Sequence, residues 1–226
     1  MTDKTKGMSI KITRNGPIIV RGGVPLIEEI ITPVDDHYVY APGRELPQRQ
    51  VYSLCRCGKS KVHPFCDGAH SNFAFDGTET ASRENFVERA EVLPGPTVDL
   101  LDDHRCAYAR FCYRDAGDAW ELLETSAGGE KLQEGIRGAR ECPAGRLVAR
   151  DKDGHVFEDE YEPCISILQD PEKGLGCAIF VKGYIPIEGT DGHIYEPRNR
   201  VALCRCGQSK NKPFCDAAHG AAKFRE

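Results

Sequence analysis

The stretch that decides the fold reads Cys55-Arg-Cys57-Gly-Lys-Ser-Lys-Val-His-Pro-Phe-Cys66-Asp-Gly-Ala-His70. It returns near the C-terminus as Cys204-Arg-Cys206-Gly-Gln-Ser-Lys-Asn-Lys-Pro-Phe-Cys215-Asp-Ala-Ala-His219. Both copies place three cysteines and one histidine at the spacing C-x-C-x8-C-x3-H. Three soft thiolates and one imidazole form a set that binds metal, so the repeat predicts two metal centres.

Composition narrows the class of protein around these centres. The chain has 226 residues, a net charge of −5 and a pI near 5.8, which argue against nucleic acid as an electrostatic partner. No apolar run approaches the roughly 20 residues of a membrane span, and the N-terminus lacks the apolar stretch of a signal peptide. We therefore expect a soluble cytoplasmic protein in which the 11 cysteines stay available for metal rather than forming a disulfide framework.

The repeat extends beyond the cysteine motif. Residues 179–187 match residues 18–26, and residues 201–203 lead into the second motif as residues 51–54 lead into the first. We expect strands at these positions, so the repeated unit is a strand-rich domain of about 60 residues. The predicted domains are 8–93, 97–169 and 175–226, with linkers at 94–96 and 170–174.

The segment between the repeats has a pattern of its own. We expect helices over 102–114, 119–125 and 130–141, and a hairpin formed by 147–149 and 155–157. The predicted fold class is therefore α+β, with a helical and stranded segment between two small β-rich units.

The two motifs resemble the signature of the CDGSH iron–sulfur domain, or NEET fold: C-x-C-x2-(S/T)-x3-P-x-C-D-G-(S/A/T)-H. The first copy satisfies every position, and the second departs only where Ala217 replaces the glycine. The resemblance implies a 2Fe–2S cluster in each copy, with Cys55 and Cys57 on one iron and Cys66 and His70 on the other. In the second copy the corresponding ligands are Cys204, Cys206, Cys215 and His219.

The resemblance also implies an arrangement. CDGSH units work as two-protomer, β-rich assemblies, so the two copies are expected to form an intramolecular pseudo-dimer. Structural zinc stays an alternative because three cysteines and a histidine are also a zinc set, although zinc motifs usually open with C-x2–4-C.

Several residues near the ligands receive separate expectations. Ser60 and Ser209 either hydrogen-bond toward cluster sulfur or shape a turn. Asp67 and Asp216 are expected to cap the short helices that carry the histidines. Arg56 and Arg205 are expected to be solvated, and His63, which Lys212 replaces in the second copy, is expected to be a surface side chain.

A third cysteine set lies in the middle segment. Cys106 and Cys112 form C-x5-C, and Cys142 is followed by Pro143. The set is similar to that of divergent single-cluster ferredoxins, with Ala109 at the position of the missing ligand. This resemblance implies a ferredoxin-like α+β domain with a 3Fe–4S or a 4Fe–4S cluster. Two readings stay open for Cys164, a fourth thiolate or a small buried residue in a strand, and Cys177 is expected to be structural.

These sites together predict an electron-transfer protein. No dinucleotide fingerprint, P-loop or nucleophile motif is present, so we expect a carrier rather than an enzyme. Its partners would be a redox donor and acceptor, with no nucleic acid and no membrane. The alternative is an iron–sulfur cluster donor or redox sensor, because a histidine ligand can be protonated and released.

Overall fold

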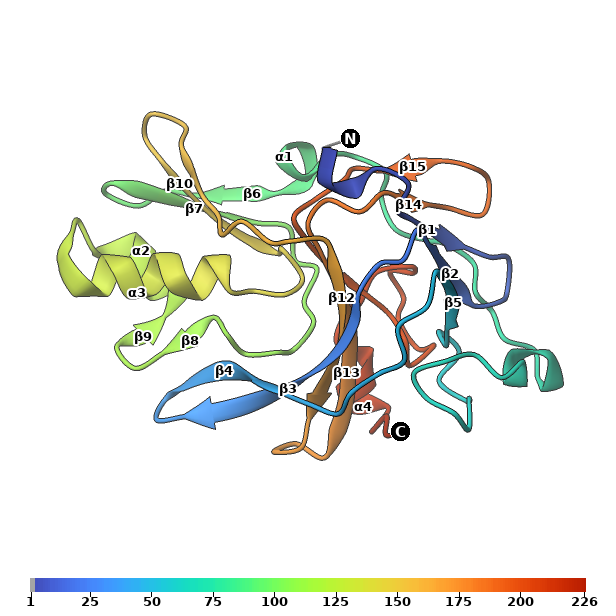
Figure 1. Ribbon diagram of the computed structural model, residues 1–226. Coiled ribbons are helices and arrows are strands. Elements are labelled where there is room, and N and C mark those ends of the chain that lie inside the picture. The colour runs from blue at the N-terminus through green and yellow to red at the C-terminus, as the bar shows by residue number, and fades with distance from the viewer. Residues whose placement is uncertain (1–2) are drawn as a thin grey trace.

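The computed structural model describes residues 3–226 and has a mixed α+β fold rich in sheet (Figure 1). Two five-stranded sheets and one four-stranded sheet carry most of the strands. The first sheet contains β1 (Ser9–Ile12), β2 (Ile18–Arg21), β5 (Val51–Leu54), β14 (Ile187–Glu188) and β15 (Ile194–Tyr195). The second contains β3 (Leu26–Val34), β4 (His37–Pro42), β12 (Cys164–Asp170), β13 (Leu175–Lys182) and β16 (Arg200–Leu203).

Each five-stranded sheet combines strands from both repeats. The first has the order β15-β14-β1-β2-β5, and the second has the order β16-β13-β12-β3-β4. Strands β1, β2 and β5 thus share the first sheet while the β3–β4 hairpin crosses to the second. Strands β12, β13 and β16 share the second sheet while the β14–β15 hairpin crosses to the first. The central strands pair in parallel, with Ile10 opposite Ile187 in the first sheet and Ile165 opposite Leu26 in the second.

Alternating apolar side chains explain why the two sheets pack face to face. Ile10, Ile12, Ile18 and Val20 are at most 1% exposed and share one core with Ile165 and residues of β13 and β16. Alternation is typical of a strand that buries one face, so this core contains inward-facing residues of both repeats. The expected strands at 51–54 and 201–203 are present. Residues 18–26 contain β2 and the start of β3, and residues 179–187 contain the end of β13 and the start of β14, with a bend between the two strands in each case.

The middle segment forms a third layer. Its sheet has the order β11-β10-β7-β6, from β6 (Glu91–Leu93), β7 (Val98–Asp102), β10 (Leu147–Asp151) and β11 (Val156–Phe157). Helices α2 (Ala119–Thr125) and α3 (Gly129–Arg140) pack against β7 and β10 (Figure 1). The predicted helices at 119–125 and 130–141 and the predicted hairpin are thus confirmed. The remaining elements are η1 (Asp3–Thr5), η2 (Ala69–Asn72), α1 (Phe86–Arg89), α4 (Ala218–Ala221) and the small hairpin β8 (Tyr113–Arg114) and β9 (Gly117–Asp118).

The predicted helix over 102–114 is wrong. Residues 103–112 form an irregular loop in which His104, Tyr108 and Arg110 adopt positive φ values of 62°, 54° and 67°. A right-handed helix excludes such values. Arg110 is instead held by a bidentate ion pair to Asp170, at 2.6 and 3.2 Å, so a distant contact overrides the local helical tendency.

Two further observations concern the whole described chain. All eleven cysteines are free, so they remain available as ligands. Among the helices of residues 3–226, none combines the length and apolar character needed to cross a bilayer.

Candidate metal centres

The first ligand loop closes back on the strand from which it starts. The Cys55 N–H donates to Pro64 O at 2.8 Å, and the Cys66 N–H donates to Ser53 O at 2.9 Å. These two bonds hold the first and third cysteines side by side at the end of β5. The Ser60 hydroxyl donates to Phe65 O at 2.7 Å and accepts from the Val62 N–H, which settles its role as turn formation.

The second loop repeats this hydrogen bonding at the end of β16. Cys204 donates to Pro213 O and Cys215 donates to Ala202 O, each at 2.9 Å. The Ser209 hydroxyl donates to Phe214 O at 2.7 Å, as in the first copy. The sixteen-residue motif therefore specifies one local backbone in two places.

The aspartate after the third cysteine bridges the loop instead of capping a helix. One Asp67 carboxylate oxygen accepts from the Lys61 N–H at 2.8 Å, and the other accepts from the Ala69 N–H at 3.0 Å. The N-cap position of η2 belongs to Gly68, without a side-chain bond. Asp216 makes the same two contacts, to Lys210 and Ala218, so the capping expectation is corrected to an Asx turn in both copies.

The ligands are grouped in pairs. The sulfur atoms of Cys55 and Cys57 are 3.6 Å apart, and Cys66 Sγ lies 3.5 Å from His70 Nδ1. The corresponding distances in the second copy are 3.7 Å and 3.6 Å. Two sulfur ligands on one tetrahedral metal at about 2.3 Å are separated by about 3.7 Å, so each pair has the spacing of two ligands on one metal.

This pairing fits a two-iron cluster better than one zinc ion. A zinc site brings all four ligands around a single centre. Within residues 3–226, no group of three or more His, Cys, Asp or Glu side chains converges closely enough to hold one ion. A 2Fe–2S cluster needs only two protein ligands on each iron, because sulfides supply the rest. The donor set and its division into pairs therefore fit that cluster in both copies.

The two loops touch each other. A Cβ at Gly58 would lie 2.4 Å from Cys206 O, and a Cβ at Gly207 would lie 2.7 Å from Cys57 O. Both glycines have positive φ, 73° and 79°. The contact is reciprocal, so equivalent glycines allow each loop to approach the backbone of the other.

The arginines inside the motif are buried, which overturns the expectation that they are solvated. Arg56 is 3% exposed and donates to the carbonyl oxygens of Thr13, Gly16 and Gly77 at 2.7 to 3.0 Å. Arg205 is 1% exposed and donates to Cys177 O and Leu168 O at 2.7 and 2.9 Å. Each guanidinium ties its ligand loop to neighbouring backbone.

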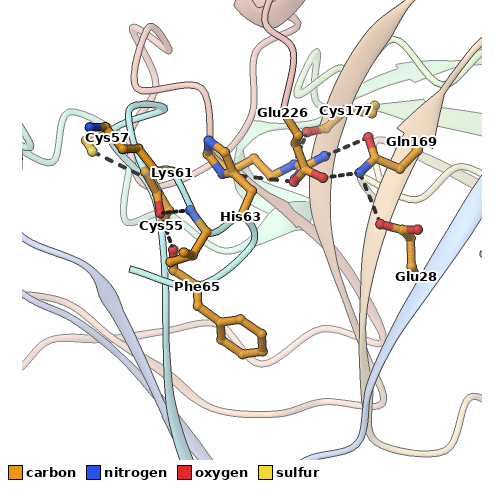
Figure 2. Close-up of polar contacts among 12 residues, drawn as sticks. Glu28, Cys55, Cys57, Lys61, His63, Phe65, Gln169, Cys177 and Glu226 are labelled. Atoms are coloured by element: carbon orange, nitrogen blue, oxygen red, sulfur yellow. Dashed lines mark hydrogen bonds and ion pairs between the residues drawn. The ribbon is translucent and has the colours of Figure 1, made fainter. Parts of the chain in front are cut away.

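Arg205 differs from Arg56 in having a carboxylate partner, Glu226. Figure 2 shows Glu226 between the His63 ring of the first loop and Gln169, which also contacts Glu28. The side chain of His63 is 8% exposed, and its Nδ1 lies 4.0 Å from Glu226, so the expected surface histidine is an enclosed one. Burial lowers the His63 pKa.

The two histidine ligands have unequal surroundings. His219 is 2% exposed, whereas His70 is only half-buried. Burial, with a contribution from Arg205, lowers the pKa of His219 to about 4. Ala217 has a φ of 68° where Gly68 has 85°, so the second copy keeps the same turn with a residue that disfavours it.

Burial also governs the thiols. It raises the pKa of Cys57 to about 11 and raises that of Cys66 and Cys215. The hydrogen bond from Cys206 lowers the pKa of Cys204 to about 6. Metal binding must therefore displace protons from most of these sulfurs, and an iron centre supplies the charge that favours the thiolates.

The middle cysteines are brought together by the 103–112 loop and the turn after α3. Each of Cys106, Cys112 and Cys142 lies close enough to influence the charge of another of the three, and burial raises the pKa of Cys112 to about 12. The Tyr108 N–H donates to Cys106 Sγ at 3.2 Å. A backbone N–H that points at a ligand sulfur suits a negatively charged group. Three cysteines around such a loop fit a cluster with three thiolate ligands.

The two remaining cysteines differ. Cys164 lies on β12, where its charged neighbours are Lys182 and Glu29 rather than the middle trio, which favours the reading as a strand residue. Cys177 is 1% exposed and its thiol donates to Ala107 O at 3.2 Å. It also packs in one cluster with Cys215, so this structural cysteine joins the middle loop to the second ligand loop.

Sequence reasoning missed the residues that dock the middle segment. Arg200 is 1% exposed and donates to Cys142 O and Ala139 O at 2.8 Å, besides pairing with Glu158. Arg110 pairs with Asp170, as described above. For Arg200 the only signal in the sequence was its position next to a predicted strand, where a charged side chain is usually solvated.

Comparison with protein families identifies the class. The model of the family described as "Iron-binding zinc finger CDGSH type" matches residues 15–71 and 178–220. Comparisons with curated proteins and with solved structures found no match. The chain therefore carries two regions of the CDGSH iron-binding type, residues 15–71 and 178–220. Because CDGSH domains bind 2Fe–2S clusters, it is an iron–sulfur protein.

Proposed function

We propose that this chain is a three-centre electron-transfer protein. Two 2Fe–2S clusters would be held by the CDGSH loops, and a 3Fe–4S or 4Fe–4S cluster by Cys106, Cys112 and Cys142. Iron–sulfur clusters exchange single electrons with little change in their protein ligands. The observation that carries the proposal is the contact between ligand loops: the first loop touches the second at Gly58 and Gly207, and the second touches the middle loop through Cys177.

The arrangement of strands supports reading the two copies as an intramolecular pseudo-dimer. Exchange of β3 and β4 with β14 and β15 gives each five-stranded sheet an equivalent contribution from the two repeats. A single repeat would leave β3 without its neighbour β12 and β14 without its neighbour β1, and a domain of about 60 residues buries little surface by itself. Supplying both halves in one chain removes the need for a second protomer.

The chain's own residues would hold and insulate the clusters. Arg56 and Arg205 fix the loops to neighbouring backbone and place positive charge near the ligand sulfurs. Burial of the cysteines in the CDGSH loops limits water around each pair, with Cys55 and Cys204 only 2% and 3% exposed. Limited solvation and fixed ligands are what an electron carrier requires, because both reduce reorganisation during transfer.

The ferredoxin-like assignment of the middle segment rests on its ligand loop. A sheet, two helices and a Cys-Pro turn surround the three cysteines, and Ala109 is 4% exposed at the position of the missing ligand. A stoichiometric reduction experiment tests the proposal: anaerobic titration of the loaded protein is expected to give reversible reduction of three centres. Irreversible bleaching of all of them on reduction would contradict a carrier.

A second candidate function, donation of a cluster, is favoured by one observation. His70 is half-buried whereas His219 is 2% exposed, so the first site is the more accessible. Mixing the loaded protein with an apo-ferredoxin distinguishes the two functions. Rapid transfer of visible absorption to the acceptor supports donation, whereas reversible reduction without transfer supports a carrier.

A further inference from the structure

A recess of about 540 Å³ lies where the middle loop meets the second ligand loop. Tyr108 comes from the middle loop, Leu175 from the start of β13, and Gly220 from α4. Lys173, Lys223 and Arg225 add three cationic side chains to the lining. All three cations are exposed, and Tyr108 is 44% exposed, so the recess has an aromatic side and a basic rim.

The positive charge at this rim is largely uncompensated. Lys173 pairs with Glu172 at 2.9 Å, but Glu172 also lies 3.1 Å from Arg110. Throughout residues 3–226, no carboxylate oxygen comes within ion-pair distance of Lys223 or Arg225. Nearby Glu226 is already engaged by Arg205 and Arg44. A chain with net charge −5 thus presents a local basic surface here.

Other recesses of similar size are acidic. One of about 480 Å³ is lined by Glu28, Glu29 and Glu45, with Arg44 as its cation. Another of about 430 Å³ is lined by Glu158, Asp159 and Glu160, with Lys4 as its cation. An anionic partner would therefore be attracted to the basic recess and repelled from these two surfaces.

The recess also adjoins two sets of ligands. The backbone of Tyr108 contacts Cys106 Sγ at 3.2 Å, and Gly220 directly follows His219. The Tyr108 ring lies 3.9 Å from the position of a Cβ at Gly220. An occupant of the recess would therefore approach the middle site and the second CDGSH site at once.

We propose that this basic recess is the docking surface for an acidic electron-transfer protein. The inference rests on the proposed carrier function and specifies the chemistry of its partner. A protein fits better than a small anion because the cations stand on the exposed rim, and none of the lining side chains is a buried polar group. Small-ligand sites instead have polar groups that converge inside a pocket. Exposed charge around an aromatic contact is typical of a transient protein interface.

Binding of the loaded full-length protein to an immobilised acidic plant-type ferredoxin tests the surface. Surface plasmon resonance is expected to give a Kd that increases as salt concentration rises. The double variant Lys223→Glu/Arg225→Glu is expected to raise Kd at low salt by about tenfold or more. The conservative variant Lys223→Arg is expected to keep the wild-type Kd.

A matched control separates this surface from bulk charge. Lys6→Glu/Lys131→Glu makes the same change in net charge at exposed positions outside the recess, and it is expected to leave Kd within about twofold. An equal loss of ferredoxin affinity in both double variants, or binding that is insensitive to salt, would overturn the docking surface. Binding of inorganic phosphate to the recess without binding of ferredoxin would also overturn it, with a small anion as the occupant.

Redox behaviour is measured on the same samples to keep the two proposals apart. Reversible reduction of the charge-reversal variant by dithionite, together with lost ferredoxin binding, supports both the docking surface and the carrier function. Reversible reduction with unchanged binding overturns the docking surface alone. Failure of the wild-type protein to undergo reversible reduction overturns the carrier function, and the proposed identity of the partner with it.

Discussion

The two CDGSH loops share a backbone but differ in their surroundings. Their ligand pairs have the same separations within 0.1 Å, and their serines close the same turn. Yet Arg56 bonds only to backbone carbonyls whereas Arg205 also pairs with Glu226, and His70 is half-buried whereas His219 is enclosed. The motif therefore determines where the ligands lie, whereas the rest of the chain determines how accessible each site is.

The middle segment is one source of this difference, because it docks on the second loop. Arg200, on the strand that leads into Cys204, bonds to Cys142 O, and Cys177 bonds to Ala107 O. Val51 stands at the position that corresponds to Arg200 in the first copy. The Arg200 contact therefore has no counterpart in the first copy, and the two sites become inequivalent within one chain.

The largest expected effect comes from the buried arginines. Arg205→Met would leave the carbonyl oxygens of Leu168 and Cys177 without a donor and remove a partner of Glu226. We therefore expect the free energy of unfolding to fall by about 4 kcal/mol. Arg56→Met also leaves carbonyl oxygens without donors, but it leaves no carboxylate without its partner. We expect it to lower the free energy of unfolding by about 2 kcal/mol. Urea denaturation measures both. A loss in Arg56→Met that equals or exceeds the loss in Arg205→Met would remove this distinction between the loops.

The next largest loss of stability is expected where the two ligand loops touch. Gly58→Ala and Gly207→Ala each place a methyl group against a carbonyl oxygen at positive φ, and we expect each to cost about 3 kcal/mol. Gly68→Ala is the matched control, since its φ of 85° is similar but a Cβ there meets nothing within 4 Å. We expect about 1 kcal/mol for the control. Equal losses at all three positions would mean that the loops do not press against each other.

Acid should weaken the middle segment through Asp102. Its side chain is 2% exposed; burial would raise its pKa, but hydrogen bonds from Arg146, the His104 N–H and Trp120 outweigh this and lower it. A carboxyl with a lowered folded-state pKa adds stability above its unfolded pKa of about 3.9 and loses it as pH falls through the folded value.

Asp102→Asn should remove that dependence on pH and cost about 3 kcal/mol at neutral pH, because Arg146 would lose its charged partner. Urea midpoints measured at several pH values check both effects. If the variant retained the acid dependence of the wild-type protein, other carboxyl groups would be responsible for it.

The smallest effect concerns the single departure from the motif. Ala217→Gly should stabilise the protein by about 0.5 kcal/mol, because relief of left-handed strain exceeds the entropy that glycine adds to the unfolded chain. The gain is expected as a higher thermal midpoint, with unchanged visible absorption of the loaded protein. A lower midpoint would show that Ala217 contributes a contact that glycine lacks.

Local pattern predicted some parts of this molecule well. The strands that enter both loops and the helices α2 and α3 follow from short-range spacing and periodicity, and the assignment of the ligand residues stays a prediction. The exchange of hairpins between the two sheets could not be predicted, because the sequence of a strand does not determine which other strand it pairs with. The 103–112 loop was mistaken for a helix because the contact between Arg110 and Asp170 joins residues 60 apart in sequence.

Burial of charged residues was the other failure of local reasoning. Arg56, Arg200 and Arg205 look like surface residues in sequence, and each is at most 3% exposed. Backbone carbonyls from several segments satisfy each guanidinium. Only the folded chain brings these carbonyl groups together, so no spacing in the sequence predicts them.

We propose that two paired-ligand centres and a third, differently ligated centre share one chain. Iron and acid-labile sulfide content, measured with EPR on the anaerobically purified protein, tests it most directly. We expect about seven to eight iron atoms per chain, and loss of about three to four of them in the Cys106→Ser/Cys112→Ser variant with the 2Fe–2S signals retained. Stoichiometric zinc in the CDGSH loops, or the same iron content in the variant and the wild-type protein, would contradict it.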